Sequence, residues 1–111
     1  IIACAMGGTL AELTGDSAFR LHPLTEDDAR AMIDQLRGAP LLRGYRHAPL
    51  ADEAALRECV LRVSALLDVC PEIQELDINP VRVFATGIRA VDARVRIAPP
   101  RAAPTTRRIS Y

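Results

Sequence analysis

The chain has 111 residues, half of them apolar, which is enough for one small domain with a modest hydrophobic core of its own. Its 14 basic residues, all of them arginine, balance 14 acidic residues, so charge gives no reason to expect binding to nucleic acid or to an anionic membrane. No apolar run approaches the roughly 20 residues of a membrane span.

The cysteines and the first residues bear on the cellular compartment. Cys4, Cys59 and Cys70 are odd in number and lack the paired spacing of a metal site, so we expect buried, reduced thiols in a cytoplasmic protein. The chain opens on Ile1 and Ile2 and has no charged region followed by a long apolar stretch, so we expect no signal peptide.

Short strands separated by glycines are predicted at the start of the chain. The first six residues suit a buried strand that runs into Gly7 and Gly8, a pair that permits either a bend or the close approach of another group. Residues 10–13 and 17–21 are predicted to form two further strands around a three-residue loop. Glu12, on the first of these two strands, faces either a ligand cleft or solvent.

Two amphipathic helices are predicted in the middle of the chain. Thr25 and Asp28 have the spacing of a capping box that begins the first helix. That helix is expected to end near Gly38, because glycine readily takes the left-handed conformation that follows many helices. Asp52 is expected to cap the second helix, whose apolar stripe ends before Pro71.

The predicted loop between the helices, residues 41–49, contains Arg43 and Arg46. The forked donors of an arginine suit contact with the phosphates of a nucleotide or of CoA. An arginine in a loop is also commonly solvated without any ligand. The sequence leaves both interpretations open for the two side chains.

A β-hairpin near the C-terminal end carries the most specific chemistry. Side chains in residues 75–80 and 91–97 alternate between polar and apolar, as in strands with one buried face, and Gly87 can supply the positive φ of a tight turn. If the turn centres on residues 85 and 86, Asn79 lies directly opposite Asp92.

An amide oxygen and a carboxylate on adjacent strands can converge on one cation. Oxygen ligands suit Mg²⁺, which binds through one or two protein oxygens and otherwise through water and nucleotide phosphates. A polar hairpin that faces solvent would have the same pattern, so spacing alone does not decide between these interpretations.

Several short motifs occur in an order that resembles the end of the ATP-grasp domain in NDP-forming acyl-CoA synthetases. This group includes ADP-forming acetyl-CoA synthetase and the β-subunit of succinyl-CoA synthetase. The resemblance spans residues 1–97 and rests on Ala5-Met6-Gly7-Gly8 with Glu12, Asp16-Ser17-Ala18-Phe19-Arg20-Leu21 before Pro23-Leu24, Leu42-Arg43-Gly44-Tyr45-Arg46, and the segments around Asn79 and Asp92. Where the family usually has Gly after Gly-Tyr-Arg, this chain has His47.

The resemblance implies roles for individual residues. Asn79 and Asp92 match the family positions that hold the magnesium of the nucleotide. Asp77 is the candidate catalytic residue, because the acidic family position that it matches lies near the phosphohistidine that carries phosphate between sites. The candidate residues for binding ATP or ADP are Gly7, Gly8, Glu12 and Arg46.

The expected fold class is α+β, an antiparallel sheet with two helices on one face, as in the C-terminal subdomain of ATP-grasp domains. Residues 1–97 would form this lobe, and residues 98–111 a flexible tail or linker. The chain has no lysine, so we expect the phosphate-binding lysine, the first lobe and the adenine pocket to lie upstream.

The leading functional hypothesis is the lobe of a larger ligase that interconverts acyl-CoA, ADP and phosphate with the acid, CoA and ATP through a phosphohistidine. The expected partners are the remaining ATP-grasp lobe and the CoA-binding and ligase domains, in the same polypeptide or in another subunit. We expect the 111-residue piece to be inactive alone. The alternative hypothesis is an effector-binding regulatory module of a GNAT-fused protein acetyltransferase.

Overall fold

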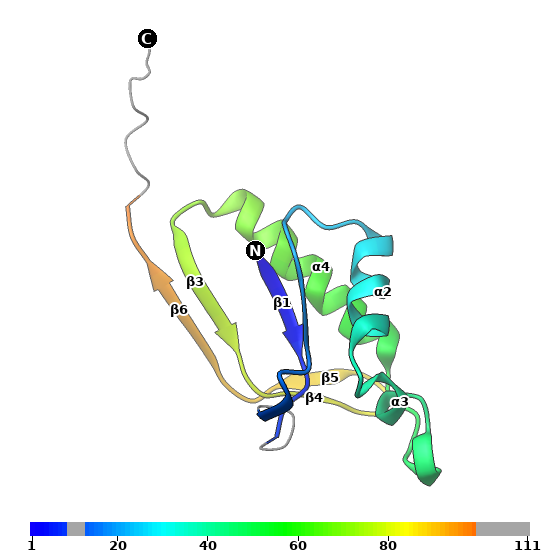
Figure 1. The fold of residues 1–111 in the computed structure, drawn as a ribbon. Helices are drawn as coiled ribbons and strands as arrows, with labels where there is room; N and C mark the ends of the chain where they lie inside the picture. The colour runs from blue at the N-terminus through cyan, green and yellow to red at the C-terminus, as the bar shows by residue number, and fades with distance from the viewer. Residues whose placement is uncertain (9–12, 100–111) are drawn as a thin grey trace.

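A computed structural model of the chain describes residues 1–8 and 13–99 (Figure 1). In chain order the elements are β1 (Ile2–Ala5), β2 (Ser17–Arg20), α2 (Glu26–Gln35), α3 (Ala39–Leu42), the 3-10 helix η1 (Tyr45–His47), α4 (Glu53–Val69), β3 (Ile73–Ile78), β4 (Val81–Val83), β5 (Ile88–Ala90) and β6 (Ala93–Ile97). Antiparallel strands and helices in one small domain confirm the α+β class. The predictions for Glu12 and for the tail beyond residue 99 fall outside the described residues.

The described strands form three two-stranded antiparallel sheets, β1–β2, β3–β6 and β4–β5, instead of the one continuous sheet that was expected. The sheet is divided because β1 and β3, which lie next to each other in Figure 1, are not hydrogen-bonded to one another. The partner of β2 is β1, in a register that places Ile2 opposite Arg20. The predicted strand at residues 10–13 is wrong at Leu13, which is helical, because β1 already occupies the edge of β2.

One long hairpin contains β3, β4, β5 and β6, and its register is the predicted one. Phe84 donates its backbone N–H to the carbonyl oxygen of Gly87 at 3.0 Å, and Gly87 has φ 83°. Farther along, Asn79 donates its backbone N–H to the carbonyl oxygen of Asp92, also at 3.0 Å. Pro80 separates the two sheets of this hairpin, because proline has no N–H to donate to a ladder.

The two longer helices begin at the predicted caps. The Thr25 side chain accepts the backbone N–H of Asp28 at 3.1 Å, and the Asp28 carboxylate accepts that of Thr25 at 2.9 Å. At the start of α4, Asp52 accepts the backbone N–H of Ala55 at 3.0 Å. Figure 1 shows α2 and α4 together on one side of β1 and β2. The core between these elements contains Ile2, Ala18, Ala29, Met32, Ile33, Leu36, Ala39 and Val60.

Gly38 follows the first helix as predicted but serves a different purpose. Its φ is −80°, so it is not a left-handed cap. A Cβ placed on Gly38 would lie 2.6 Å from the side chain of Met6, so a larger residue here would require that flexible side chain to move. Glycine at this position therefore leaves room for the side chain of Met6, the residue that follows β1, beside the start of α3.

The three cysteines are free thiols, as predicted, but they are half-buried, whereas full burial was expected. None of the described helices is long and apolar enough to cross a membrane.

Candidate functional site

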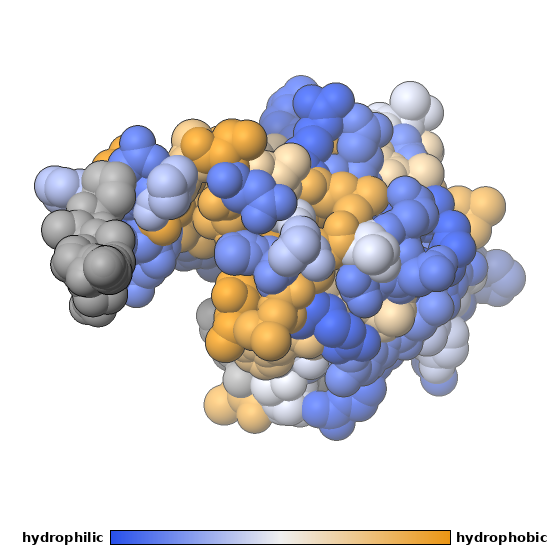
Figure 2. Space-filling model, turned by 90° about the horizontal axis from the view of Figure 1, so that it is seen from above, coloured by the Kyte–Doolittle hydropathy of each residue, from blue (hydrophilic) through white to orange (hydrophobic). Residues whose placement is uncertain are grey.

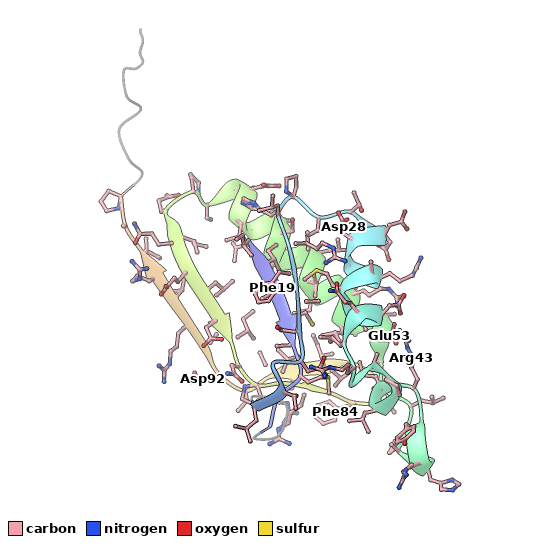
Figure 3. All side chains as sticks on the ribbon, in the orientation of Figure 1. Phe19, Asp28, Arg43, Glu53, Phe84 and Asp92 are labelled. Atoms are coloured by element: carbon pink, nitrogen blue, oxygen red, sulfur yellow. The ribbon has the colours of Figure 1, made fainter. Side chains whose placement is uncertain are left out.

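The C-terminal ends of β1 and β3 lie at the same end of the molecule, because the two strands run in the same direction (Figure 1). Gly7 and Gly8 follow β1, and Asn79 follows β3. Asp92, labelled in Figure 3, lies at this same end, immediately before β6. The structure thus brings four of the predicted site residues to one end of the two strand pairs.

Asn79 and Asp92 are exposed and directly opposed across the hairpin. One carboxylate oxygen of Asp92, Oδ1, accepts the backbone N–H of Ala93 at 2.9 Å. In the described part of the chain, neither the other carboxylate oxygen nor the side-chain amide of Asn79 has a protein partner. Two side-chain oxygens without a protein partner are therefore available as metal ligands on opposite arms of the hairpin.

The oxygens of Asn79 and Asp92 could supply only part of the coordination shell of a magnesium ion. Among the described residues there is no group of three or more histidine, cysteine, aspartate or glutamate side chains that could hold a metal ion. A cation at Asn79 and Asp92 would therefore complete its shell with water and with a ligand such as a phosphate. Mg²⁺ commonly binds in this manner, with few protein oxygens and several other ligands.

Asp77 lies on the exposed face of β3, two residues before Asn79 and opposite Arg94 on β6. The neighbouring pair on this face, Glu75 and Arg96, forms an ion pair of 3.2 Å. The hydrogen bond from Arg96 lowers the pKa of Glu75 below its ordinary value, and the same bond raises the pKa of Arg96. Asp77 is thus placed on the same face as the candidate metal ligands, since side chains alternate along a strand.

The two glycines after β1 differ in backbone conformation. Gly8 has φ 99°, a conformation that residues with side chains rarely adopt. Gly7 has no positive φ, and a Cβ built on it would meet no heavy atom within 4 Å. Packing within the described residues therefore does not require glycine at position 7.

Arg46 does not join the other candidates. It belongs to η1, which lies beside α3 on the opposite side of the molecule from Asp92 (Figures 1 and 3). Its guanidinium lies 5.5 Å from the ring centre of Tyr45, and its Nε is 3.2 Å from the Tyr45 hydroxyl. Within the described chain, the Arg46 side chain is therefore separate from the site at Asn79.

His47, which follows the Gly-Tyr-Arg motif, has a left-handed backbone conformation. The φ angles of Arg46 and His47 are 53° and 66°. Positive φ is uncommon for residues with side chains, although histidine tolerates it better than bulky or branched residues do. The histidine therefore has a backbone conformation that glycine adopts more readily.

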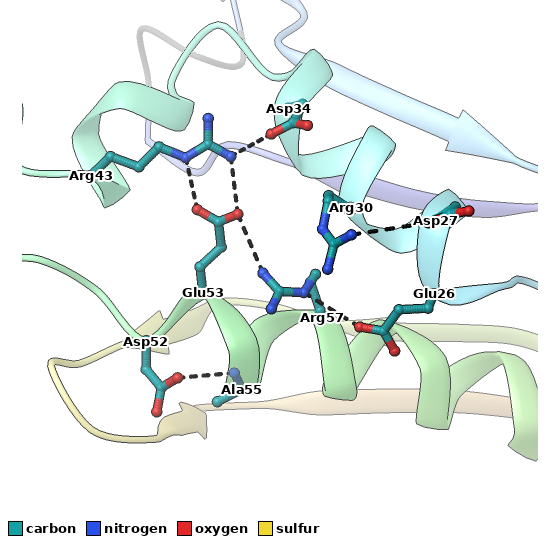
Figure 4. Close-up of polar contacts among 9 residues, drawn as sticks. All are labelled: Glu26, Asp27, Arg30, Asp34, Arg43, Asp52, Glu53, Ala55 and Arg57. Carbon is teal, nitrogen blue, oxygen red and sulfur yellow. Dashed lines mark hydrogen bonds and ion pairs between the residues drawn. The ribbon is translucent and has the colours of Figure 1, made fainter.

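Arg43 is engaged within the protein. Figure 4 shows its guanidinium between Glu53 of α4, at 2.8 and 2.9 Å, and Asp34 of α2, at 2.5 Å. These hydrogen bonds raise the pKa of Arg43, and the Arg43 guanidinium lowers the pKa of Glu53. The arrangement favours a structural role for Arg43 over the contact with phosphate or CoA that its sequence context also allowed.

Two aspartates have roles that the sequence analysis missed. Asp16 is buried, and its carboxylate oxygens accept the backbone N–H groups of Arg37 at 2.7 Å and Gly38 at 2.8 Å. Asp52 caps α4 and also accepts the backbone N–H of Gly87 at 2.7 Å, which holds the tip of the hairpin against that helix. The only sequence signal for Asp16 was its place at the head of the Asp-Ser-Ala-Phe-Arg motif.

Comparison with known proteins agrees with these observations. The sequence profile described as the ATP-grasp domain matches residues 1–97. The chain belongs to the ATP-grasp family.

Curated ATP-grasp relatives with high similarity are ADP-forming ligases. The β subunit of ADP-forming acetate–CoA ligase II from Pyrococcus furiosus is 41% identical over 97 residues, which cover 85% of this chain and 41% of that subunit. ADP-forming acetate–CoA ligase I from Archaeoglobus fulgidus is 39% identical over 95 residues, covering 86% of this chain and 14% of that protein. The chain thus spans less than half the length of either relative.

The ATP-grasp region of a solved structure has the same fold. Acetyl-coenzyme A synthetase 1 from Ca. Korarchaeum cryptofilum, in complex with coenzyme A and Mg-AMPPCP, aligns with a TM-score of 0.82 and 35% sequence identity. The alignment covers 86% of this chain and 45% of that chain. The resemblance to NDP-forming acyl-CoA synthetases, and to their ATP-grasp domain in particular, is confirmed.

Proposed function

We propose that this chain is the magnesium- and nucleotide-binding lobe of an NDP-forming acyl-CoA synthetase. The complete enzyme would interconvert acyl-CoA, ADP and phosphate with the acid, CoA and ATP. The observation that carries the proposal is the opposed pair Asn79 and Asp92, whose free oxygens stand at the end of the molecule where the Gly7-Gly8 segment also lies. The ADP-forming relatives and the Mg-AMPPCP complex of the Korarchaeum enzyme support the same assignment.

Each residue would contribute through position and charge. Asn79 and Asp92 would hold a magnesium ion through their side-chain oxygens, and the backbone after β1 would lie close to the nucleotide phosphates. When bound, the ion would neutralise negative charge on the phosphates, which is the main requirement of phosphoryl transfer. Asp77 would face the segment that carries the phosphohistidine, which in the Korarchaeum structure points towards the nucleotide-binding site.

The remaining parts of the site would come from elsewhere. The chain has no lysine to bind the nucleotide phosphates, and its two histidines, His22 and His47, do not lie in a motif that resembles the phosphohistidine. The partners would therefore be the rest of the ATP-grasp domain and the domains that bind CoA. The 111-residue chain alone would be inactive, and steady turnover by this piece would contradict the proposal.

Calorimetry on the longer protein that contains this chain tests the metal site. ADP binding would be measured with and without magnesium for the wild type, Asn79→Ala, Asp92→Ala and Asp92→Asn. We expect each substitution to weaken binding at least about tenfold in the presence of magnesium, a loss of about 1.4 kcal/mol. In its absence, the variants should bind like the wild type, because the lost interaction runs through the ion.

The matched control is Asp68→Asn, which removes an acid from an exposed position on α4. Circular dichroism would verify that all variants remain folded. If magnesium-dependent binding is unchanged in the Asn79 and Asp92 variants, the pair is a solvent-facing part of the hairpin and the proposal fails. Binding without any turnover by the longer protein would instead favour the effector-binding regulatory module.

A further inference from the structure

Two arginines lie directly opposite each other on the short β4–β5 sheet. Arg82 of β4 pairs with Arg89 of β5, and both residues are exposed. Directly opposed residues have Cβ atoms roughly 4.5–5.5 Å apart, and like charges in this arrangement repel each other. An anion bound between the two guanidinium groups would remove the repulsion.

The packing of the hairpin determines the face on which the two arginines lie. Ile88 lines a pocket of about 540 Å³ beside α4, and Val81 and Val83 are partly buried. Because side chains alternate along a strand, Arg82 and Arg89 project from the other face of the sheet. The apolar residues of this hairpin therefore hold the two positive charges side by side.

Neither charge is neutralised within the described part of the chain, where the side chains of Arg82 and Arg89 form no ion pair and no hydrogen bond. The acid that contacts the tip of this hairpin is Asp52. One of its carboxylate oxygens accepts the backbone N–H of Ala55, and the other accepts that of Gly87. Asp52 is therefore engaged with the backbone and leaves both arginines without an acidic partner.

Other exposed arginines do have acidic neighbours. Arg62 borders the pocket beside α4, where Figure 2 shows apolar surface between the hairpin and the rest of the molecule, and it pairs with Glu58 at 2.7 Å. Arg94 lies opposite Asp77 on the β3–β6 sheet. The opposition of two like charges on β4 and β5 thus differs from the arrangement of these other arginines.

Phe84, labelled in Figure 3, adjoins the arginine pair. The Arg89 guanidinium lies 5.9 Å from the centre of its ring, a cation–π contact that orients the charge. The ring is 43% exposed and also lines a second pocket, of about 350 Å³, whose lining is entirely apolar and includes Leu41 and Leu50. Two unpaired positive charges and an apolar groove therefore meet at Phe84.

We propose that Arg82 and Arg89 bind a phosphate monoester whose organic part lies over Phe84 and the adjoining apolar pocket. A phosphate monoester carries a charge of about −1.5 to −2 at pH 7 and has three acceptor oxygens. It can therefore neutralise both guanidinium groups and accept hydrogen bonds from both forks at once. A carboxylate has a single charge and two oxygens, and it would leave one arginine uncompensated.

The proposal goes beyond the function proposed above and uses none of the residues assigned to magnesium. The same phosphate group occurs on small molecules and on phosphorylated serine, threonine or tyrosine side chains of a protein. Both sources present the chemistry that the arginine pair recognises, so the experiment includes a probe for each of them.

NMR of the longer protein, isotopically labelled on its arginine nitrogens, tests the site without nucleotide or magnesium. The probe is phenyl phosphate, and the matched control is phenyl sulfate, which has a similar shape but only one negative charge. We expect phenyl phosphate to shift the Nε–H signals of Arg82 and Arg89 in a saturable manner and to bind at least about tenfold more tightly than phenyl sulfate. Phosphate bound elsewhere in the enzyme would not produce these shifts.

Substitutions test each guanidinium through the signal of the other. Arg82→Gln and Arg89→Gln should each weaken the binding of phenyl phosphate at least about tenfold. The lysine variants at these positions keep the charge but lose the fork, so they should recover only part of the affinity. Arg30→Gln, which removes a positive charge from an exposed position on α2, should bind like the wild type.

Two further measurements separate ligand contact from folding and locate the organic part. Thermal unfolding of Arg82→Gln and Arg89→Gln without ligand should occur at the wild-type temperature or slightly above it, because the substitution relieves repulsion. Phenyl phosphate should bind more tightly than inorganic phosphate to the wild type, and this preference should disappear in Phe84→Ala. A preference that survives in Phe84→Ala would contradict the placement of the organic part.

A peptide with phosphoserine between apolar residues distinguishes the two sources. Binding at least about tenfold tighter than that of phenyl phosphate would assign the site to a phosphorylated protein segment. Equal or weaker binding would assign it to a small phosphorylated molecule. Either result supports recognition of a phosphate monoester by the arginine pair.

Three results would overturn the proposal. The signals of Arg82 and Arg89 could show no saturable shift, which would leave the pair without a ligand. Phenyl sulfate could bind as tightly as phenyl phosphate, or the lysine variants could bind like the wild type. Either of these would reduce the site to a general attraction between positive charge and anions. Because magnesium and nucleotide are absent, each result would leave the proposal for Asn79 and Asp92 to be decided by calorimetry.

Discussion

The Asp16 carboxylate accepts the backbone N–H of Gly38 at 2.8 Å, across a separation of 22 residues. It also accepts the N–H of Arg37 at 2.7 Å, so one buried side chain satisfies two donors in the turn between α2 and α3. These bonds fix that turn against the start of β2. The first residue of the Asp-Ser-Ala-Phe-Arg motif therefore has a structural role in this chain.

Asp16→Ala should lower the free energy of unfolding by about 2–4 kcal/mol, because two donors in a partly buried turn would lose a charged acceptor. Asp16→Asn keeps one acceptor oxygen and should cost about half as much. Urea unfolding of the longer protein would measure both effects. Asp68→Ala, at an exposed position, should change stability by less than about 0.5 kcal/mol. Equal stability of Asp16→Ala and Asp68→Ala would contradict the structural role.

Arg43 joins three helical segments, since it precedes η1 at the end of α3 and binds Asp34 of α2 and Glu53 of α4 (Figure 4). Arg43→Ala should lower stability by about 1 kcal/mol, a modest loss because the Arg43 side chain is 44% exposed to solvent. Arg43→Lys keeps the charge but cannot make the forked contact with Glu53, so it should recover only part of the loss.

Thermal unfolding and nucleotide calorimetry on the Arg43 variants separate the two interpretations of this residue. The structural role requires lower stability with unchanged affinity for magnesium and ADP. Unchanged stability together with weaker binding of ADP or CoA would show that Arg43 contacts a phosphate in the assembled enzyme.

Asp52 makes stability depend on pH at the tip of the hairpin. The backbone N–H groups of Gly87 and Ala55 lower the pKa of its carboxyl group. A carboxyl group with a lowered pKa in the folded state stabilises the fold at pH values above its unfolded pKa, which is about 3.9. This stabilisation is lost as the pH falls below about 4 and through the lower pKa of the folded state.

Asp52→Asn should therefore be less stable than the wild type at pH 7, and the difference should shrink below about pH 4. Hydrogen exchange of the Gly87 amide, measured at pH 3 and pH 7, would report directly on its hydrogen bond to Asp52. Asp68→Asn serves as the control, because its exposed position on α4 gives no such bonds to lose. A stability difference that is the same at pH 3 and pH 7 would mean that the charge of Asp52 is not what holds the turn.

The sequence was sufficient wherever the determining interactions are local. The capping box of Thr25 and Asp28 and the cap at Asp52 depend on residues three positions apart. The opposition of Asn79 and Asp92 followed from one turn, because a tight turn at Gly87 sets the register of the whole hairpin.

Interactions between distant segments could not be predicted in the same way. The bond from Gly38 to Asp16 and the packing of Met6 on Gly38 depend on how β1 meets the first helix. The division into three sheets, where one was expected, depends on β1 and β3 being unpaired. Arg46 shares a short motif with Arg43, yet the structure separates it from Asp92, since a sequence motif does not specify where its loop lies.

The glycines after β1 allow backbone strain to be distinguished from ligand contact. Gly8→Ala should lower stability by about 1–2 kcal/mol, because alanine must adopt the positive φ of 99°. Gly7→Ala should leave stability unchanged or slightly higher, because its added methyl group meets no heavy atom of the described chain within 4 Å.

The two variants should differ again in nucleotide binding. If the backbone at position 7 approaches a phosphate, Gly7→Ala should weaken the binding of magnesium and ADP at least about tenfold in a protein of normal stability. Calorimetry and urea unfolding on the same samples of the longer protein would give both quantities. Normal affinity in Gly7→Ala would mean that the glycine pair forms a bend in which only position 8 requires glycine. The nucleotide would then be bound by Asn79, Asp92 and the other lobe, without the backbone at position 7.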